Sequence, residues 1–221
     1  MDTAPYTVTA TDAHTSARCG VLHTAQGDVQ TPVFMPVGTR GTVKAVTTNV
    51  LSELGAQILL GNAYHLSLRP GVDLIARAGG LHAFMNWQRP LLTDSGGFQI
   101  FSLGDTFAID EDGVSFRSII DGQAHRWTPE ENMRIQELIG ADIIMQLDVC
   151  CGYPATRDEV TSAMERSLAW AARCKAAHTR ADQLLFGIVQ GGMHLDLRLA
   201  SLAGLAEIGF PGYGIGRLQR R

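Results

Sequence analysis

Short apolar runs that end in small or polar residues recur along the chain and predict buried strands. Four of these runs end near Asn62, Asp94, Asp148 and Gln190, and a fifth, GYGIG, lies close to the C-terminal end. Nearly continuous apolar runs are typical of strands that are covered on both faces, as in a parallel sheet between helices. In such sheets, polar residues at the carboxyl ends of the strands form the active face.

Helical patterns separate these runs. The sequence TPEE supplies a capping hydroxyl at Thr128 and a proline at the first helical position, and Gly140 favours the end of that helix. Thr156 and Glu159 form a second capping-box pattern, and a third helix is expected to close at Gly209. The apolar face of this third helix is expected to consist of four leucines at helical spacing: Leu195, Leu199, Leu202 and Leu205.

Two segments depart from the strand-helix alternation. Residues from about 5 to 33 resemble short antiparallel strands, and TFAIDEDGVSFRS predicts a β-hairpin that turns at Asp112 and Gly113. The remaining units, from about 33 to 218, fit either a (β/α) barrel or an open doubly wound sheet. A closed eightfold barrel takes roughly 250 residues. With five or six strands, the fold is therefore either smaller than a barrel or the N-terminal part of one.

Composition narrows the functional classes. The net charge of −4 and the pI of about 5.9 argue against a protein that coats nucleic acid non-specifically. No apolar run reaches the roughly 18 residues of a membrane span, and the N-terminal segment has no secretory signal pattern. The four cysteines show neither a disulfide framework nor a CxxC pair, which predicts a reducing, cytoplasmic location and no metal ligands.

The polar strand ends suggest a binding site for a planar heterocycle. Asp94, Asp148 and Gln190 converge if their strands are neighbours, and carboxylate and amide groups match the donors and acceptors of a purine-like edge. Phe98, one turn beyond Asp94, is placed to stack on such a ring. Taken singly, each of these residues is more often a turn or a helix cap, so the joint pattern carries the hypothesis.

Several long motifs in one order resemble the tRNA-guanine transglycosylase family, closest to its bacterial, queuosine-forming type. The resemblance rests on FMPVGTRGTVKAV, ILLGNAYHLSLRPG, LLTDSGGFQIFSL, VSFRSIIDG, ADIIMQLDVC, YPAT and LFGIVQGGM, and it extends over most of the chain. It implies an irregular (β/α)8 TIM barrel with a zinc subdomain near its C-terminal end. We therefore expect residues 1–221 to form one incomplete barrel domain, the N-terminal portion of the family fold.

The resemblance also implies an activity. Members of the family exchange guanine at the wobble position of certain tRNAs for a deazaguanine base, through a covalent link between an aspartate and the ribose. This chemistry parallels that of retaining glycosidases. The implied partners are tRNA, the deazaguanine base and a second copy of the chain in a homodimer, with no membrane.

Site residues follow from the matched motifs. Asp94 matches the general acid/base, with Ser95 and Phe98 in the wall of the base pocket. Asp148 matches the aspartate that binds the pyrimidine edge, and Gln190 the glutamine that reads the carbonyl. The remaining implied contacts are Cys150, which favours the aminomethyl-deazaguanine precursor (preQ1), Gly216 of a glycine pair, and Val37, Leu60 and Asn62 at the pocket floor or the ribose site.

The sequence also departs from the family pattern. IGGLSVGE of the family is replaced by IGRLQRR, so that Arg217 stands at the second glycine and is expected to crowd the pocket. No residue matches the nucleophilic aspartate or the zinc ligands, which lie further along the family sequence. Two hypotheses follow: a transglycosylase portion that is inactive alone, or a non-catalytic module that binds a deazaguanine or a partner subunit.

Overall fold

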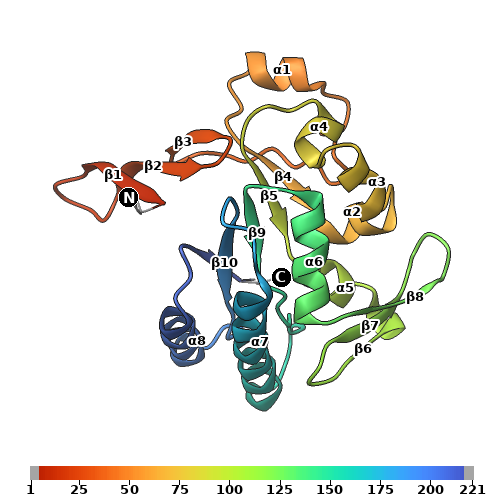
Figure 1. Ribbon diagram of the computed structural model, residues 1–221. Coiled ribbons are helices and arrows are strands. Elements are labelled where there is room, and N and C mark those ends of the chain that lie inside the picture. The colour runs from red at the N-terminus through yellow and green to blue at the C-terminus, as the bar shows by residue number, and fades with distance from the viewer. Residues whose placement is uncertain (1–4, 217–221) are drawn as a thin grey trace.

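The computed structural model describes residues 5–216, apart from the side chain of Asp105. Its fold is mixed α/β, with a parallel sheet that carries helices on one side (Figure 1). One antiparallel sheet precedes the parallel strands in the chain, and another is inserted in the chain between two of them. Arg217 lies outside the described residues, so its expected effect on the pocket stays a prediction. The strands are β1 (Tyr6–Thr11), β2 (Arg18–Thr24), β3 (Gly27–Thr31), β4 (Leu59–Asn62), β5 (Leu91–Asp94), β6 (Phe107–Ile109), β7 (Val114–Arg117), β8 (Ala124–Trp127), β9 (Ile143–Met145), β10 (Leu184–Val189) and β11 (Tyr213–Ile215).

The central sheet is parallel and contains five strands in the order β11-β10-β9-β5-β4. An isolated parallel bridge between Val37 and Leu60 extends it beyond β4. Within residues 5–216, β11 and β4 do not pair with each other, so the sheet is open along both edges. The parallel sheet and the antiparallel strands confirm the expected mixed α/β fold, and the incomplete barrel stays a prediction.

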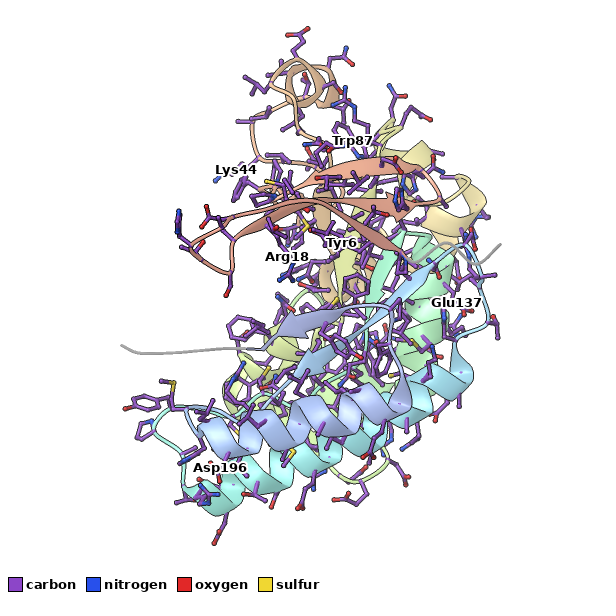
Figure 2. The ribbon with its side chains drawn as sticks, turned by 90° about the vertical axis from the view of Figure 1, so that its left-hand side faces the viewer. Tyr6, Arg18, Lys44, Trp87, Glu137 and Asp196 are labelled. Carbon is purple, nitrogen blue, oxygen red and sulfur yellow. The ribbon has the colours of Figure 1, made fainter. Side chains whose placement is uncertain are left out.

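Helices cover the outer side of this sheet. Figure 2 shows the long helices α7 and α8 lying side by side along one flank of the molecule, away from the N-terminal strands. Apolar side chains of the outer strand face pack under the helices, including Leu91, Ile144 and Leu185. The helices are α1 (Thr48–Glu53), α2 (Ala63–Leu68), α3 (Val72–Arg77), α4 (Leu81–Met85), α5 (Gly97–Phe101), the 3-10 turn η1 (Gly104–Thr106), α6 (Pro129–Ile139), α7 (Arg157–Ala177) and α8 (Leu195–Ile208).

The antiparallel strands form two small sheets, as expected. Strands β1, β2 and β3 pair in order, and Val29 packs with Leu92 and Ile143 on the inner face of the parallel sheet. The hairpin of β6 and β7 turns at the expected Asp112 and Gly113 and gains a third strand, β8. The ring of Phe107 on β6 lies 6.1 Å from that of Phe101 on α5, so this second sheet lies next to the helix that carries Phe98.

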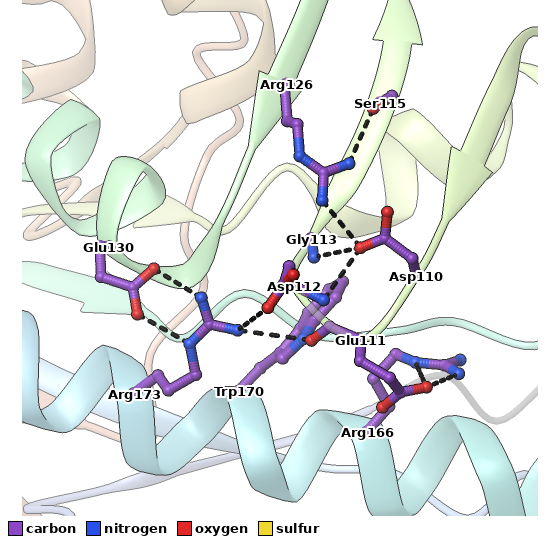
Figure 3. A network of polar contacts seen from close by, with 10 residues as sticks. All are labelled: Asp110, Glu111, Asp112, Gly113, Ser115, Arg126, Glu130, Arg166, Trp170 and Arg173. Atoms are coloured by element: carbon purple, nitrogen blue, oxygen red, sulfur yellow. Dashed lines mark hydrogen bonds and ion pairs between the residues drawn. The ribbon is translucent and has the colours of Figure 1, made fainter.

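Polar contacts fix the β6–β7 turn against α7 (Figure 3). The indole N–H of Trp170 donates to the backbone carbonyl of Glu111 at 2.8 Å. Arg173 makes a two-pronged ion pair with Glu130 at 2.7 and 2.8 Å, and Arg166 pairs with the Glu111 side chain. Exposed ion pairs contribute little each. Among these contacts, the hydrogen bond from the buried Trp170 side chain is the one with the least exposed donor.

The predicted helix caps are present. Thr128 accepts a hydrogen bond from the backbone N–H of Glu131 at 3.2 Å, and Gly140 ends α6 with a φ of 78°. At α7, Thr156 and Glu159 form a complete reciprocal capping box. One strand is shorter than predicted, because β9 ends at Met145 and Asp148 follows in irregular backbone.

The expected apolar face of α8 is wrong at three of its four positions. Leu195, Leu199 and Leu202 are 71%, 57% and 41% exposed, and only Leu205 is buried. Leu197 and Ser201 share the buried side with Leu205. Leucine is a strong helix former, and helical spacing identifies a shared face without identifying which face is covered.

Two substitutions test this correction. We expect Leu205→Ala to lower the free energy of unfolding by about 2–5 kcal/mol, because it opens a cavity under the helix. Leu199→Ala is the matched control, with an expected change within about 0.5 kcal/mol. Urea unfolding followed by circular dichroism measures both changes, and equal losses would contradict the assignment of the buried face.

Candidate base-binding site

The carboxyl ends of β4, β5 and β10, together with the segment after β9, surround one cavity of about 540 Å³. Alternation along β5 explains how Asp94 reaches it. Leu92 and Asp94 point to the inner face and line the cavity, whereas Leu91 and Thr93 point to the helices. The cavity is lined by Met35, Leu60, Leu92, Asp94, Ser95, Gly96, Phe98, Gln99, Met145, Asp148, Cys150, Phe186, Ile188, Gln190, Tyr213, Gly214, Ile215 and Gly216.

Asp94 is held by residues at the end of the neighbouring strand. The side-chain amide of Asn62 donates to Asp94 Oδ2 at 2.6 Å, and the backbone N–H of Ala63 donates to Oδ1 at 3.3 Å. Burial raises the pKa of Asp94 to about 7, and the charge of Asp148 adds to the shift against these hydrogen bonds. A carboxyl group that titrates near neutral pH is suited to both giving and accepting a proton.

Asp148 is the acceptor at the centre of the site. Its Oδ1 accepts from the Ser95 hydroxyl at 2.9 Å, and its Oδ2 accepts from the side-chain amide of Gln190 at 2.6 Å. The thiol of Cys150 lies 3.6 Å from the same Oδ2. Burial raises the pKa of Asp148, while these donors favour its charged form.

Close backbone approaches shape the cavity at two glycines. A Cβ at Gly97 would lie 2.7 Å from both the carbonyl oxygen and Oδ1 of Asp148. A Cβ at Gly216 would lie 2.9 Å from the side-chain amide of Gln190. Real Cβ atoms do not come this close to other heavy atoms, so larger residues would displace both acceptor and amide.

Gly97→Ala tests this packing. We expect it to lower the free energy of unfolding by about 1–3 kcal/mol, because the added methyl group must push Asp148 out of its position. Gly152→Ala is the control, since its Cβ would lie 3.6 Å from Phe101, which is an ordinary contact. Thermal unfolding of the two variants and the parent measures the difference, and a stable Gly97→Ala variant would contradict the geometry.

The structure brings most of the predicted site residues together. Asp94, Ser95, Phe98, Asp148, Cys150, Gln190, Gly216 and Leu60 all line the cavity. Asn62 reaches it through its hydrogen bond to Asp94, and the side chain of Phe98 is 44% exposed at its edge. Val37 is not among the lining residues and instead bridges to Leu60 in the sheet.

Sequence reasoning missed several lining residues. Met35, Gln99 and Tyr213 lie on the cavity, although no polar strand end marks them. Gln99 follows Phe98 on α5, so a helical start directly after Asp94 was the signal that could have found it.

The part of the chain that the structure describes offers no metal centre. Among residues 5–216, no three His, Cys, Asp or Glu side chains are grouped so that they could hold an ion. Cys19 is exposed, whereas Cys174 is buried within α7. The described His, Cys, Asp and Glu side chains therefore do not match the ligand set of the zinc site that the family resemblance implies. In the same described range, no helix is long and apolar enough to cross a membrane.

Comparison with known proteins decides the family. The family model described as queuine tRNA-ribosyltransferase matches residues 12–220. The chain belongs to this family. The match confirms the resemblance to the tRNA-guanine transglycosylases, and the Asp94–Asp148–Gln190 cavity lies within the matched residues.

Relatives support the same assignment. The chain is 56% identical over 207 residues to the queuine tRNA-ribosyltransferase of Halothermothrix orenii, covering 94% of this chain and 56% of that protein. It is 55% identical over 219 residues to the enzyme of the same name from Caldanaerobacter subterraneus subsp. tengcongensis, covering 99% of this chain and 58% of that protein. The chain thus spans a little over half the length of these curated relatives.

Proposed function

We propose that this chain contributes the base-binding part of a tRNA-guanine transglycosylase that exchanges the wobble guanine of tRNA for 7-aminomethyl-7-deazaguanine. The observation that carries the proposal is the convergence of Asp94, Asp148 and Gln190 on one cavity. No Lys or Arg side chain lines that cavity in the described residues. Two carboxyl groups without a basic neighbour favour a ligand that is rich in N–H donors and carries a positive charge, as the aminomethyl base does.

Each side chain has a role in this proposal. Asp148 accepts from the ring N–H and the exocyclic amino group of the base. Gln190 donates one amide hydrogen to Asp148 and the second to Cys150 Sγ at 3.9 Å. In the bound state this second hydrogen turns from the weak thiol acceptor to the base carbonyl. Phe98 stacks on the ring, and the apolar side chains of Leu60 and Met145 cover it.

Asp94 is proposed to act as the general acid and then as the general base. In its acid form it protonates the departing guanine as the bond between N9 and the ribose C1′ breaks and an incoming carboxylate bonds to C1′. As a carboxylate it then takes the N9 proton of the new base, whose nitrogen displaces that carboxylate from C1′. A pKa of about 7 leaves both forms populated at neutral pH. The target base must leave the anticodon stack first.

In this proposal the nucleophilic carboxylate comes from outside these 221 residues. We therefore propose that these residues bind the base without turning it over by themselves, as one incomplete barrel domain of the (β/α)8 type. Zinc, which the family holds in its zinc subdomain, enters no step here. Homodimer formation and a cytoplasmic location stay predictions.

Two assays separate this proposal from a pure binding module. Calorimetric titration with the aminomethyl-deazaguanine is expected to show one site on the 221-residue protein, and exchange of radiolabelled guanine into tRNA is expected to be absent. Adding the C-terminal remainder of a relative should restore exchange. Binding without exchange in that mixture would favour a non-catalytic module, and no binding would refute the proposal.

Phe98→Ala tests the stacking role. We expect the affinity for the base to fall by about 1–3 kcal/mol, because the ring loses its aromatic partner. Phe84→Ala is the control, since Phe84 has a similar exposure of 39% and does not line the cavity. Calorimetry measures both, and an unchanged affinity in Phe98→Ala would rule out stacking.

A further inference from the structure

Three fully buried polar side chains connect the outer helices to the rim of the cavity. Asn132 on α6, Ser167 on α7 and Ser201 on α8 have exposed fractions of 0%, 1% and 0%. Buried polar side chains on helices normally need a partner. Each of these three finds it in the backbone of a segment that carries a site residue.

The contacts fall at equivalent places. Asn132 Nδ2 donates to the carbonyl oxygen of Ser95 at 2.8 Å, next to Asp94. The backbone N–H of Val149, next to Asp148, donates to Ser167 Oγ at 2.9 Å. The backbone N–H of Gln190 donates to Ser201 Oγ at 3.1 Å, so Ser201, like Asn132 at Ser95, binds the backbone of a residue that lines the cavity.

Ser95 and Gln190 directly follow β5 and β10, whereas Val149 lies four residues after the end of β9. β5 ends at Asp94, β9 at Met145 and β10 at Val189. Past these ends the ladder of the sheet no longer fixes the backbone, although Asp148 and Gln190 lie there and Asp94 is the last paired residue of β5. Hydrogen bonds from the helix side chains therefore fix the backbone where the strand ladder has ended.

A second amide braces the anchor on α6. Gln136 Nε2 donates to Asn132 Oδ1 at 2.8 Å and to the carbonyl oxygen of Met145 at 2.7 Å. Its Oε1 accepts from the Thr93 hydroxyl at 3.1 Å. Gln136 thus links β5 to β9 through the helix, and it fixes which way the Asn132 amide points.

We propose that Asn132, Ser167 and Ser201 are positioning residues that set the orientation of Asp94, Asp148 and Gln190 toward the base. Apolar side chains would suffice to pack these helices on the sheet. A directional hydrogen bond adds a fixed angle at each segment, and base recognition depends on such angles. The inference rests on the proposed function of the cavity and deepens it.

Ser201→Ala is the sharpest test, because it removes one hydroxyl and leaves the Gln190 N–H buried without that acceptor. The expected result is an affinity for the aminomethyl-deazaguanine about 10-fold weaker than that of the parent. Ser118→Ala is the matched control. Ser118 is also buried and accepts from a backbone N–H, that of Ile120 at 3.1 Å, but it does not line the cavity. Its affinity should equal that of the parent, so lost stability alone would not explain the result.

Amide hydrogen exchange gives a readout that needs no ligand. In Ser201→Ala, the Gln190 amide is expected to exchange about 10-fold faster than in the parent, while the Leu185 amide near the start of β10 is unchanged. Ser167→Ala should act in the same way on Val149. Unchanged exchange at Gln190, or an unchanged affinity in Ser201→Ala, would overturn the proposal. If the parent binds no base, the proposed function fails, and hydrogen exchange alone decides the positioning role.

Discussion

Asp94→Asn is expected to raise the free energy of unfolding at pH 8 by up to about 4 kcal/mol. The pKa of this carboxyl is about 7 in the folded chain, against 3.8 for an unperturbed aspartate. Each unit between these values corresponds to about 1.4 kcal/mol. The largest cause is burial, which penalises the charged form, and the nearby Asp148 charge increases that penalty.

The pH dependence follows from the sign of this shift. Because the folded pKa lies above the unfolded one, the folded state binds the proton more tightly. The contribution of Asp94 to stability is complete below about pH 4 and is lost as the pH rises through about 7. Asparagine cannot ionise and resembles the protonated acid, so the variant escapes this loss. Parent and variant should therefore unfold alike at pH 4 and diverge toward pH 8.

Urea unfolding at pH 4, 6 and 8 measures the divergence. Asp110→Asn is a control of opposite sign. The hydrogen bond from Arg126 holds the pKa of Asp110 at about 2, so this exposed carboxylate stabilises the fold above about pH 4 and loses that effect as the pH falls through about 2. Asp110→Asn should be less stable than the parent at pH 8. If Asp94→Asn is no more stable than the parent at pH 8, burial does not destabilise the charged form of Asp94.

Patterns in the sequence predict where the site lies because the polarity of adjacent residues marks where each buried strand ends. Buried strands are mostly apolar, so the polar residues that end β4 and β5 and directly follow β10 mark the rim of the sheet. These residues converge because the carboxyl ends of neighbouring parallel strands lie at the same edge of the sheet. The exact end of β9 does not follow, because Gln146 to Val149 are buried without ladder pairing beyond Gln146 and read like a continuing strand.

Other features depend on long-range packing and left no local signal. The leucines on the outer side of α8 resemble a core face, and only the position of the sheet shows that Leu205 is covered and Leu199 is not. No sequence pattern marks the polar residues Asn132 and Ser201 as buried, although both are completely buried. Their partners are backbone groups far along the chain, which no periodicity can identify. The helix-borne anchors were therefore accessible only from the structure.

Asp148→Asn is expected to weaken binding of the aminomethyl-deazaguanine by at least about 100-fold. Hydrogen bonds to a charged acceptor contribute about 1.5–3 kcal/mol each, and the proposed contact uses two of them. Asparagine keeps one oxygen, which must face the Gln190 amide at the position of Oδ2, and it turns an N–H group toward Ser95. The amide N–H of the asparagine then faces an N–H donor of the base, so one hydrogen bond is replaced by a repulsive contact between two donors.

Asp142→Asn provides the matched control for this variant. Asp142 is a buried carboxylate as well, and it accepts from His82 at 2.9 Å, from the Leu91 N–H at 2.8 Å and from the Gln26 N–H at 3.0 Å. These contacts lie at the starting ends of β5 and β9, opposite the cavity. Asp142→Asn should therefore lose stability but keep the parent affinity in calorimetry. If both variants lost affinity equally, Asp148 would act only through stability; if only Asp148→Asn does, its carboxylate is the group that recognises the base.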